Sequence, residues 1–177
     1  MTTHYYTASS LDGFIASPEN SLDWLLKQDI DLEGPMAYPA FIQSMGALAM
    51  GATTYEAIQA EEGDDGWPYT RPAFVFTHRQ LNASPGADVR FVQGDVRTVH
   101  AEMTAAVPGK DLWVMGGGEL AGQFADAGLL DEIWVQFAPV TLGAGAPLFP
   151  RELDLELVDI ARNRAFLCGR YQVKDAL

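Results

Sequence analysis

The sequence predicts an α/β domain with a mostly parallel central sheet, and two observations lead to that fold class. Short apolar runs of strand length alternate with segments of helical periodicity, which is the pattern of parallel strands joined by crossover helices. The 177 residues, of which 48% are hydrophobic, are enough for one sizeable core, so we expect a single domain over residues 1–177.

Turn residues and helix caps define the expected elements of the first half. Asp12-Gly13 and Ser17-Pro18-Glu19-Asn20 are turn signals, which predict an exposed loop after the first strand. Thr53 or Thr54 is a suitable cap for a helix with Glu56 in its first turn. The expected elements are a strand over 4–9, a short helix over 35–45, a buried strand over 47–51 and a helix over 53–60.

The second half of the chain also alternates predicted strands and helices, but it ends in two consecutive strands. Val96, Val99, Met103 and Val107 have helical spacing, so residues 95–107 are expected to form a helix with one apolar stripe. The remaining expected elements are strands over 72–78, 88–93, 111–116 and 131–139, and a terminal antiparallel hairpin of 155–162 and 165–173.

Composition excludes several classes of protein. A net charge of −13 disfavours nucleic-acid and anionic-membrane partners. The single cysteine, Cys168, excludes an intramolecular disulfide framework and fits a reducing compartment. His4, His78 and His100 stand singly, so we expect no metal site. There is neither a secretory signal nor an apolar run long enough to span a bilayer, so we expect a soluble cytoplasmic protein.

Glycines follow the apolar run 111–116. Gly116-x-Gly118-x-x-Ala121 fits a relaxed dinucleotide-binding pattern, in which helix N–H groups face a pyrophosphate. The next strand ends Gln136-Phe137-Ala138-Pro139, without the carboxylate that an ordinary Rossmann site uses for a ribose. The glycines therefore remain either an anion cradle or a strand-to-helix corner.

Two more polar clusters follow expected strands. "MGATT" (50–54) places a glycine and two threonines at a helix start, and "THR" (77–79) places an arginine after the next strand. Ligands of open α/β sheets bind at the carboxyl ends of parallel strands. Together the three clusters predict an extended, multiply phosphorylated ligand.

In this order and spacing the motifs resemble the dihydrofolate reductase superfamily, and in particular stand-alone relatives of the riboflavin-biosynthesis deaminase-reductase C-terminal domain. The resemblance implies a three-layer dihydrofolate-reductase-like fold and an NADPH-dependent reductase that transfers a hydride to a small heterocycle, either ribosylaminopyrimidine-like or pterin-like. Relatives are often dimers, so a homodimer is also expected. The matching segments are "SSLDGFIA" (9–16), "SLDWL" (21–25), "AMGATTYE" (49–56), "FVFTHR" (74–79), "LWVMGGGELAGQF" (112–124) and "DEIWVQFAPVTLGAGAPLFP" (131–150).

The resemblance also assigns roles to individual residues. The nicotinamide is expected to be bordered by Ala8 and Ile15, and the substrate to lie near Asp12, Asp23, Trp24 and Gln136. Trp24 is equally compatible with anchoring the loop in the core. The cofactor pyrophosphate is expected to contact Gly51, Thr53, Thr54, Gly116, Gly117, Gly118, Glu119 and Leu120, and the adenosine ribose and its 2′-phosphate to contact Thr77, His78 and Arg79.

Two departures from the family pattern limit these expectations. Ala52 stands where relatives commonly carry an arginine for the 2′-phosphate, so NADH is an alternative to NADPH. Residues 35–45 contain no carboxylate, so efficient dihydrofolate reduction is not expected, and the proton donor is Asp12, Asp23 or water. The alternative function is a non-catalytic member that binds a nucleotide or small ligand without turnover.

Overall fold

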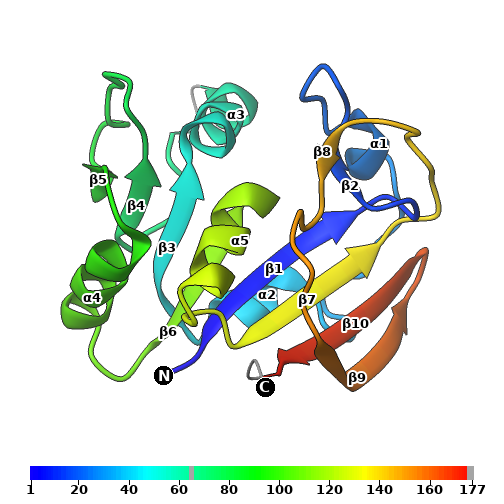
Figure 1. Ribbon diagram of the computed structural model, residues 1–177. Helices are drawn as coiled ribbons and strands as arrows, with labels where there is room; N and C mark the ends of the chain where they lie inside the picture. Colours follow the sequence, from blue (N-terminus) through cyan, green and yellow to red (C-terminus); the bar gives the residue numbers. More distant parts are fainter. Residues whose placement is uncertain (64–65, 175–177) are drawn as a thin grey trace.

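The computed structural model describes residues 1–63 and 66–174, which form a central sheet flanked by helices (Figure 1). The strands of this sheet are β1 (Thr3–Ser9), β3 (Met45–Gly51), β4 (Ala73–Phe76), β5 (Val89–Val92), β6 (Asp111–Gly116), β7 (Glu132–Phe137), β9 (Leu155–Asn163) and β10 (Phe166–Val173). A separate two-stranded sheet joins β2 (Phe14–Ala16) to β8 (Ala146–Pro147). The helices are α1 (Asp23–Leu26), α2 (Tyr38–Ile42), α3 (Ala52–Glu62), α4 (Val96–Ala106) and α5 (Gly118–Asp126).

The strand order of the eight-stranded sheet is β5-β4-β3-β6-β1-β7-β10-β9. All pairs from β5 to β7 are parallel, whereas β10 runs antiparallel to both β7 and β9. This arrangement confirms the predicted mostly parallel sheet and the terminal antiparallel hairpin. No helix in residues 1–63 and 66–174 is both long and apolar enough to cross a membrane.

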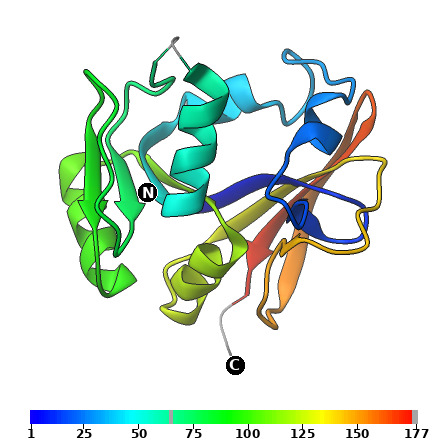
Figure 2. The ribbon, with the colours of Figure 1, turned by 90° about the horizontal axis from the view of Figure 1, so that it is seen from above.

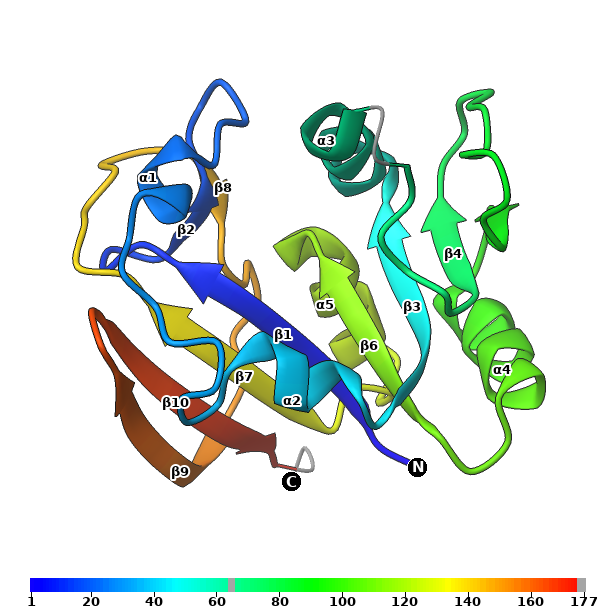
Figure 3. The same ribbon diagram turned by 180° about the vertical axis from the view of Figure 1, so that it is seen from behind.

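Helices cover both faces of the sheet, as the views from above and behind show (Figures 2 and 3). Successive strand residues point to opposite faces. In β6, Val114 packs in the core shared with α4 and α5, whereas Trp113 packs with Phe41 of α2 and Tyr55 of α3. The three layers therefore follow from the alternation of apolar residues along the central strands.

The predicted helices form, with two differences. As expected, α4 buries Val96, Val99 and Met103. Asp95, predicted as a helical residue, instead caps the helix by accepting a hydrogen bond from the N–H of Arg97. The predicted threonine cap of the helix over 53–60 is wrong, because Gly51 is the N-cap residue and the helix begins at Ala52. Strand β3 continues extended through Gly51 (ψ 163°) and turns directly into the helix, so both threonines lie in its first turn.

The predicted helix over 35–45 is only the five residues of α2. Met36 has a left-handed backbone conformation (φ 56°), which is incompatible with a helix, and Pro39 lies in the first turn, where a missing N–H costs nothing. The helix ends at Ile42 because Met45 already starts strand β3.

Candidate functional site

Strands β1 and β6 separate at their carboxyl ends. They pair only from Thr3 to Tyr5, opposite Leu112 to Val114, whereas β1 stays paired with β7 as far as Ser9. Beyond Tyr5 and Val114 a gap opens in the ladder, between the end of β1 and residues 115–117, and we call it the notch. In open α/β sheets, ligands bind at such carboxyl ends.

Glycines line the notch and bring two of the predicted clusters together. A Cβ placed on Gly116 would lie 3.7 Å from Thr54 Oγ1, and one placed on Gly51 would lie 3.9 Å from the Gly116 carbonyl oxygen. A Cβ on Gly117 would lie 3.7 Å from Ile15 Cδ1. The Gly116-Gly117 peptide bond is cis. The "MGATT" cluster, the glycine cluster and Ile15 are therefore neighbours in space.

Two helix N-termini open onto this place. Gly51 and Gly117 are the N-cap residues of α3 and α5, and neither offers a side chain to the N–H groups of the first turn. These N–H groups have no acceptor within their own helix, and the positive end of each helix dipole attracts anions. The absence of Cβ atoms lets a ligand approach this backbone closely. The two glycines and the N–H groups of these first turns fit the pyrophosphate of a dinucleotide.

Residues 118–120, which were predicted to contact the pyrophosphate, have different surroundings. A side chain at Gly118 would overlap the carbonyl oxygens of Pro147 and Leu148, so this glycine is needed for close packing of α5 against residues 147–148. Leu120 is buried in the core, and only its main chain can serve a ligand. The carboxylate of Glu119 accepts hydrogen bonds from Arg151 (2.7 and 3.0 Å), which holds its pKa below the usual range.

The third predicted cluster follows β4, which neighbours β3 in the sheet. Thr77 is buried and accepts a hydrogen bond from the N–H of Arg79 (2.9 Å). His78 is exposed. The Arg79 guanidinium forms two hydrogen bonds with Glu56 of α3, at 2.8 and 3.0 Å, and both side chains are about half exposed. Arg79 is thus held by an acidic partner beyond the first turn of α3, so the prediction that placed Glu56 in the first turn is wrong.

Asp12 makes hydrogen bonds that hold a loop. Its carboxylate accepts a bond from the Ser10 hydroxyl (2.6 Å) and bonds from the main-chain N–H groups of Leu142 (3.0 Å) and Gly143 (2.7 Å). These bonds lower the pKa of Asp12 to about 2. A carboxyl group of this pKa is ionised at neutral pH and is a poor source of protons.

The other predicted substrate residues lie in different surroundings. Trp24 of α1 is buried in a small core cluster with Ala138, Phe166 and Cys168, as its loop-anchoring interpretation requires. Asp23, in the first turn of α1, is exposed. Gln136 is 95% buried, since its exposed fraction is 5%.

The Gln136 amide group is engaged inside the protein. Its Nε2 donates hydrogen bonds to the Tyr6 hydroxyl and to the Met36 carbonyl oxygen (2.6 Å), and the Tyr6 hydroxyl donates to the same carbonyl (3.0 Å). Gln136 therefore fixes the segment that leads into α2.

Sequence reasoning did not single out three residues on the α2 side of the sheet. Met115 precedes Gly116 and packs on the sheet face that α2 covers. Tyr38 of α2 and Tyr69, from the segment between α3 and β4, pack with the same cluster, and the Tyr69 hydroxyl lies 4.0 Å from Met115 Sδ. Only an unusual density of aromatic residues in 67–69 signals this in the sequence, because tertiary packing brings the two tyrosines together.

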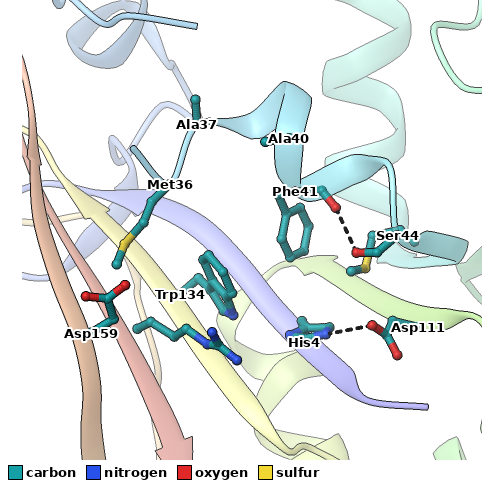
Figure 4. Close-up of a pocket in the computed structure, with 11 residues that line it drawn as sticks. His4, Met36, Ala37, Ala40, Phe41, Ser44, Asp111, Trp134 and Asp159 are labelled. Carbon is teal, nitrogen blue, oxygen red and sulfur yellow. Dashed lines mark hydrogen bonds and ion pairs between the residues drawn. The ribbon is translucent and has the colours of Figure 1, made fainter. Parts of the chain in front are cut away.

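A separate cavity of about 440 Å³ lies over the amino ends of the central strands (Figure 4). His4 lines it, buried between Asp111 (Nε2–Oδ2 3.6 Å) and Glu132 (Nδ1–Oε2 3.2 Å). Phe41 and Trp134 pack edge-on against the imidazole. Because the glycine clusters are at the opposite ends of these strands, this cavity is not part of the notch.

Comparison with known proteins decides the family. The profile of the RibD C-terminal domain matches residues 67–168, which is more than half of the chain. The chain belongs to the RibD C-terminal domain family. The uncharacterized protein YwjB of Bacillus subtilis (strain 168) is 32% identical over 148 residues, covering 83% of this chain and 82% of YwjB.

Solved structures agree with membership of the RibD C-terminal domain family. A protein of Shewanella sp. PV-4, named for riboflavin biosynthesis, matches with a TM-score of 0.84 and 26% identity over 99% of this chain and 100% of its own. Dihydrofolate reductase from Enterococcus faecalis, solved with NADP(H), matches with a TM-score of 0.67 and 16% identity over 98% of this chain and 97% of its own. The predicted dihydrofolate-reductase-like fold is confirmed.

Proposed function

We propose that this RibD C-terminal domain protein is a reductase that uses NADPH or NADH to reduce a small planar heterocycle, either ribosylaminopyrimidine-like or pterin-like. The observation that carries the proposal is the meeting of two uncapped helix N-termini, at Gly51 and Gly117, beside the notch between β1 and β6. A pyrophosphate bound there extends toward Ala8 and Ile15 on one side and Arg79 on the other.

The protein's part in such a reaction is to hold and orient. The nicotinamide supplies the hydride when it is bound. The N–H groups of the first turns of α3 and α5 bind the pyrophosphate, and Thr53 and Thr54 add hydroxyl donors. Ala8 and Ile15 present small and apolar surfaces at the notch, which restrict water at the reacting face.

Asp12, Asp23 and water are the candidate proton donors. Asp12 is ionised and already accepts bonds from Ser10, Leu142 and Gly143, so its role in our proposal is to hold the loop at residues 142–143 near β2. Asp23 is exposed on α1. Solvent water is therefore the proton source that we propose.

The preference between NADPH and NADH depends on Ala52 and Arg79. Ala52 offers no charge to a 2′-phosphate, and Arg79 is shared with Glu56. A surface ion pair of this kind is worth only about 0–1 kcal/mol, so a phosphate dianion competes well for the guanidinium. We propose that both cofactors bind, with a modest preference for NADPH.

The alternative is binding without turnover. It is favoured by the absence of a carboxylate from α2 and by the ionised state of Asp12, so neither α2 nor Asp12 supplies a proton to a substrate. It predicts that NADPH binds while no hydride is lost in the presence of any pterin or aminopyrimidine.

The test has two stages. Titration of the purified protein with NADPH and NADH, followed by fluorescence and thermal shift, measures cofactor binding; a ligand at 100 times its Kd adds about 2.7 kcal/mol of stability. Loss of nicotinamide absorbance with dihydrofolate and with phosphoribosylaminouracil substrates then measures turnover. Failure to bind either cofactor at millimolar concentration contradicts the proposal, and binding without turnover favours the alternative.

We also propose that two copies associate through β9. This strand is the last in the sheet order, and Leu157, Ile160 and Leu167 share one sheet face with exposed fractions of 54%, 60% and 50%. An edge strand offers free backbone groups, and the same strand of a second copy can pair with it antiparallel about a two-fold axis. Light scattering of the wild type and of Ile160→Lys checks this, since we expect a dimer and a monomer respectively.

A further inference from the structure

The cavity over the amino ends of the central strands is large enough for a small organic molecule. Its volume is about 440 Å³, and residues from α2 and from the strands β1, β6, β7 and β10 line it (Figure 4). Pockets that hold small molecules have volumes of about 300–1,000 Å³. The cavity is therefore of the size of a ligand site, although it lies far along the strands from the notch.

The imidazole of His4 faces this cavity without a hydrogen-bond partner. Only 7% of its side chain is exposed, and neither ring nitrogen makes a hydrogen bond within residues 1–63 and 66–174. Nε2 lies 3.6 Å from Asp111 Oδ2, which is too far for a hydrogen bond. Glu132, 3.2 Å from Nδ1, already accepts three hydrogen bonds, from Trp134 and Arg170. A buried nitrogen without a partner is destabilising, so a ligand that donates a hydrogen bond to it is favoured.

Asp111 and Ser44 add oxygen acceptors beside His4, at one end of the cavity (Figure 4). The N–H of Asp111 donates to the Ser44 carbonyl oxygen (3.3 Å), which holds the two residues together. Asp111 Oδ1 accepts a hydrogen bond from the N–H of Thr2 (2.7 Å), whereas Oδ2 faces the imidazole. The Ser44 hydroxyl donates to the Phe41 carbonyl oxygen (3.2 Å), so its own oxygen can still accept. Three acceptors therefore meet at this end.

The charges around the cavity favour a cation. Asp111 and Asp159 are both among its lining residues. Arg170 also lines it, but its guanidinium donates two hydrogen bonds to Glu132 (2.7 and 3.0 Å) and lies 4.8 Å from the ring centre of Trp134. An anion would thus meet two carboxylates and a guanidinium that is already paired. The net charge of −13 also attracts cations to the protein.

A metal ion is not the cation that this cavity suits. The described part of the chain contains no group of three His, Cys, Asp or Glu side chains that could hold a metal. Much of the lining is instead apolar, with Phe41 and Trp134 packed edge-on against the imidazole at 5.7 and 6.2 Å. The other apolar lining residues are Met36, Ala37, Ala40 and Met45. Such walls suit the hydrocarbon or aromatic part of an organic cation.

We propose that this cavity is a second ligand site, which binds a small primary amine in its protonated form. An ammonium group has three N–H donors, and Asp111, His4 and Ser44 supply three acceptors when the ring hydrogen of His4 is on Nδ1. The apolar part of the amine packs against Phe41 and Trp134. Since the glycine clusters lie at the opposite ends of the strands, this inference does not depend on the proposed reductase function.

The test uses three probes that carry a phenyl group on a short chain and differ in charge: 2-phenylethylamine, 2-phenylethanol and phenylacetate. Calorimetric titration at neutral pH and low salt measures their affinities. Asp111→Asn removes the charge and keeps an acceptor for Thr2, and Ala40→Phe fills the cavity from an exposed position of α2. Glu102→Gln, which removes an exposed carboxylate from α4, is the matched control. Thermal melts show which variants are folded.

We expect the wild type and Glu102→Gln to bind the amine at least about tenfold more tightly than the alcohol and not to bind phenylacetate. Asp111→Asn is expected to lose roughly tenfold in amine affinity and to keep its affinity for the alcohol, whereas Ala40→Phe is expected to bind none of the probes. The inference is overturned if the wild type binds no amine at millimolar concentration, or binds amine and alcohol equally. It is also overturned if either cavity variant folds and keeps the wild-type affinity for the amine.

Discussion

Arg79 and Glu56, which lies beyond the first turn of α3, form a two-bond ion pair with Nη1–Oε1 at 3.0 Å and Nη2–Oε2 at 2.8 Å. The carboxylate of Glu56 therefore lies next to Arg79, the arginine that is predicted to contact a 2′-phosphate. Any phosphate that binds Arg79 must compete with this acid, so Glu56 is expected to reduce the preference for NADPH.

Replacement of Glu56 tests this relationship. Glu56→Gln frees the guanidinium and removes a like charge from the phosphate, so we expect the ratio of NADPH to NADH affinity to rise by roughly fivefold. Titration of both cofactors at low salt measures it. Glu102→Gln, an exposed change on α4, is the control. An unchanged ratio contradicts the placement of the phosphate near Arg79.

Gly117→Ala separates folding from cofactor binding. Gly117 has an ordinary backbone conformation (φ −81°), and its added Cβ meets Ile15 Cδ1 at a normal 3.7 Å. We expect the free energy of unfolding to change by less than about 1 kcal/mol. The methyl group occupies the approach to the helix N-terminus, so NADPH affinity is expected to fall at least about tenfold. Denaturant melts and titrations check the two effects, and wild-type affinity contradicts the site.

Asp12 makes a contribution to stability that depends on pH. The pKa of Asp12 in the folded protein is about 2, against an ordinary value of 3.8, so its ionised form stabilises the fold. That stabilisation is complete above the ordinary value and is lost as the pH falls from about 4 to about 2.

The melting temperature of Asp12→Asn is therefore expected to lie below that of the wild type at pH 7. The gap between them narrows as the pH is lowered through this window. Thermal melts at several pH values measure it, with Asp23→Asn as the exposed control. A gap that stays constant down to pH 2 contradicts the assignment.

Gln136→Leu tests whether this amide is structural. The change removes a donor from Tyr6 and Met36 in a buried place, so we expect a loss of about 1–3 kcal/mol in the free energy of unfolding. NADPH affinity is expected to stay within about twofold, because the N-termini of α3 and α5 are unaffected. Wild-type stability combined with lost substrate turnover instead supports direct substrate contact by Gln136.

The sequence indicated the elements of the fold well where periodicity and caps agree. The stripe of Val96, Val99, Met103 and Val107 predicts α4 to within one residue at each end, although Asp95, which was predicted inside the helix, is its N-cap. The start of α3 was predicted wrongly, because a threonine is a good cap in general, but an extended Gly51 leads directly into the helix here. Local preference is weaker than the direction that a strand imposes on the chain.

The candidate site likewise has features that the sequence shows and contacts that only folding creates. The glycines and threonines after three strands were visible in the sequence, because parallel strands end at one edge of a sheet and polar residues there have no place in the core. The partners of Asp12, Gln136 and Arg79 were not visible, since Leu142, Met36 and Glu56 become neighbours only through folding.

Residue types and their spacing along the chain were enough to predict the fold class, the family resemblance and the three polar clusters. Only folding shows that β1 and β6 part beside Gly116, and that the Tyr69 hydroxyl lies next to Met115. Strand register and side-chain packing between distant segments depend on the free energy of the whole core, which no short stretch of sequence contains.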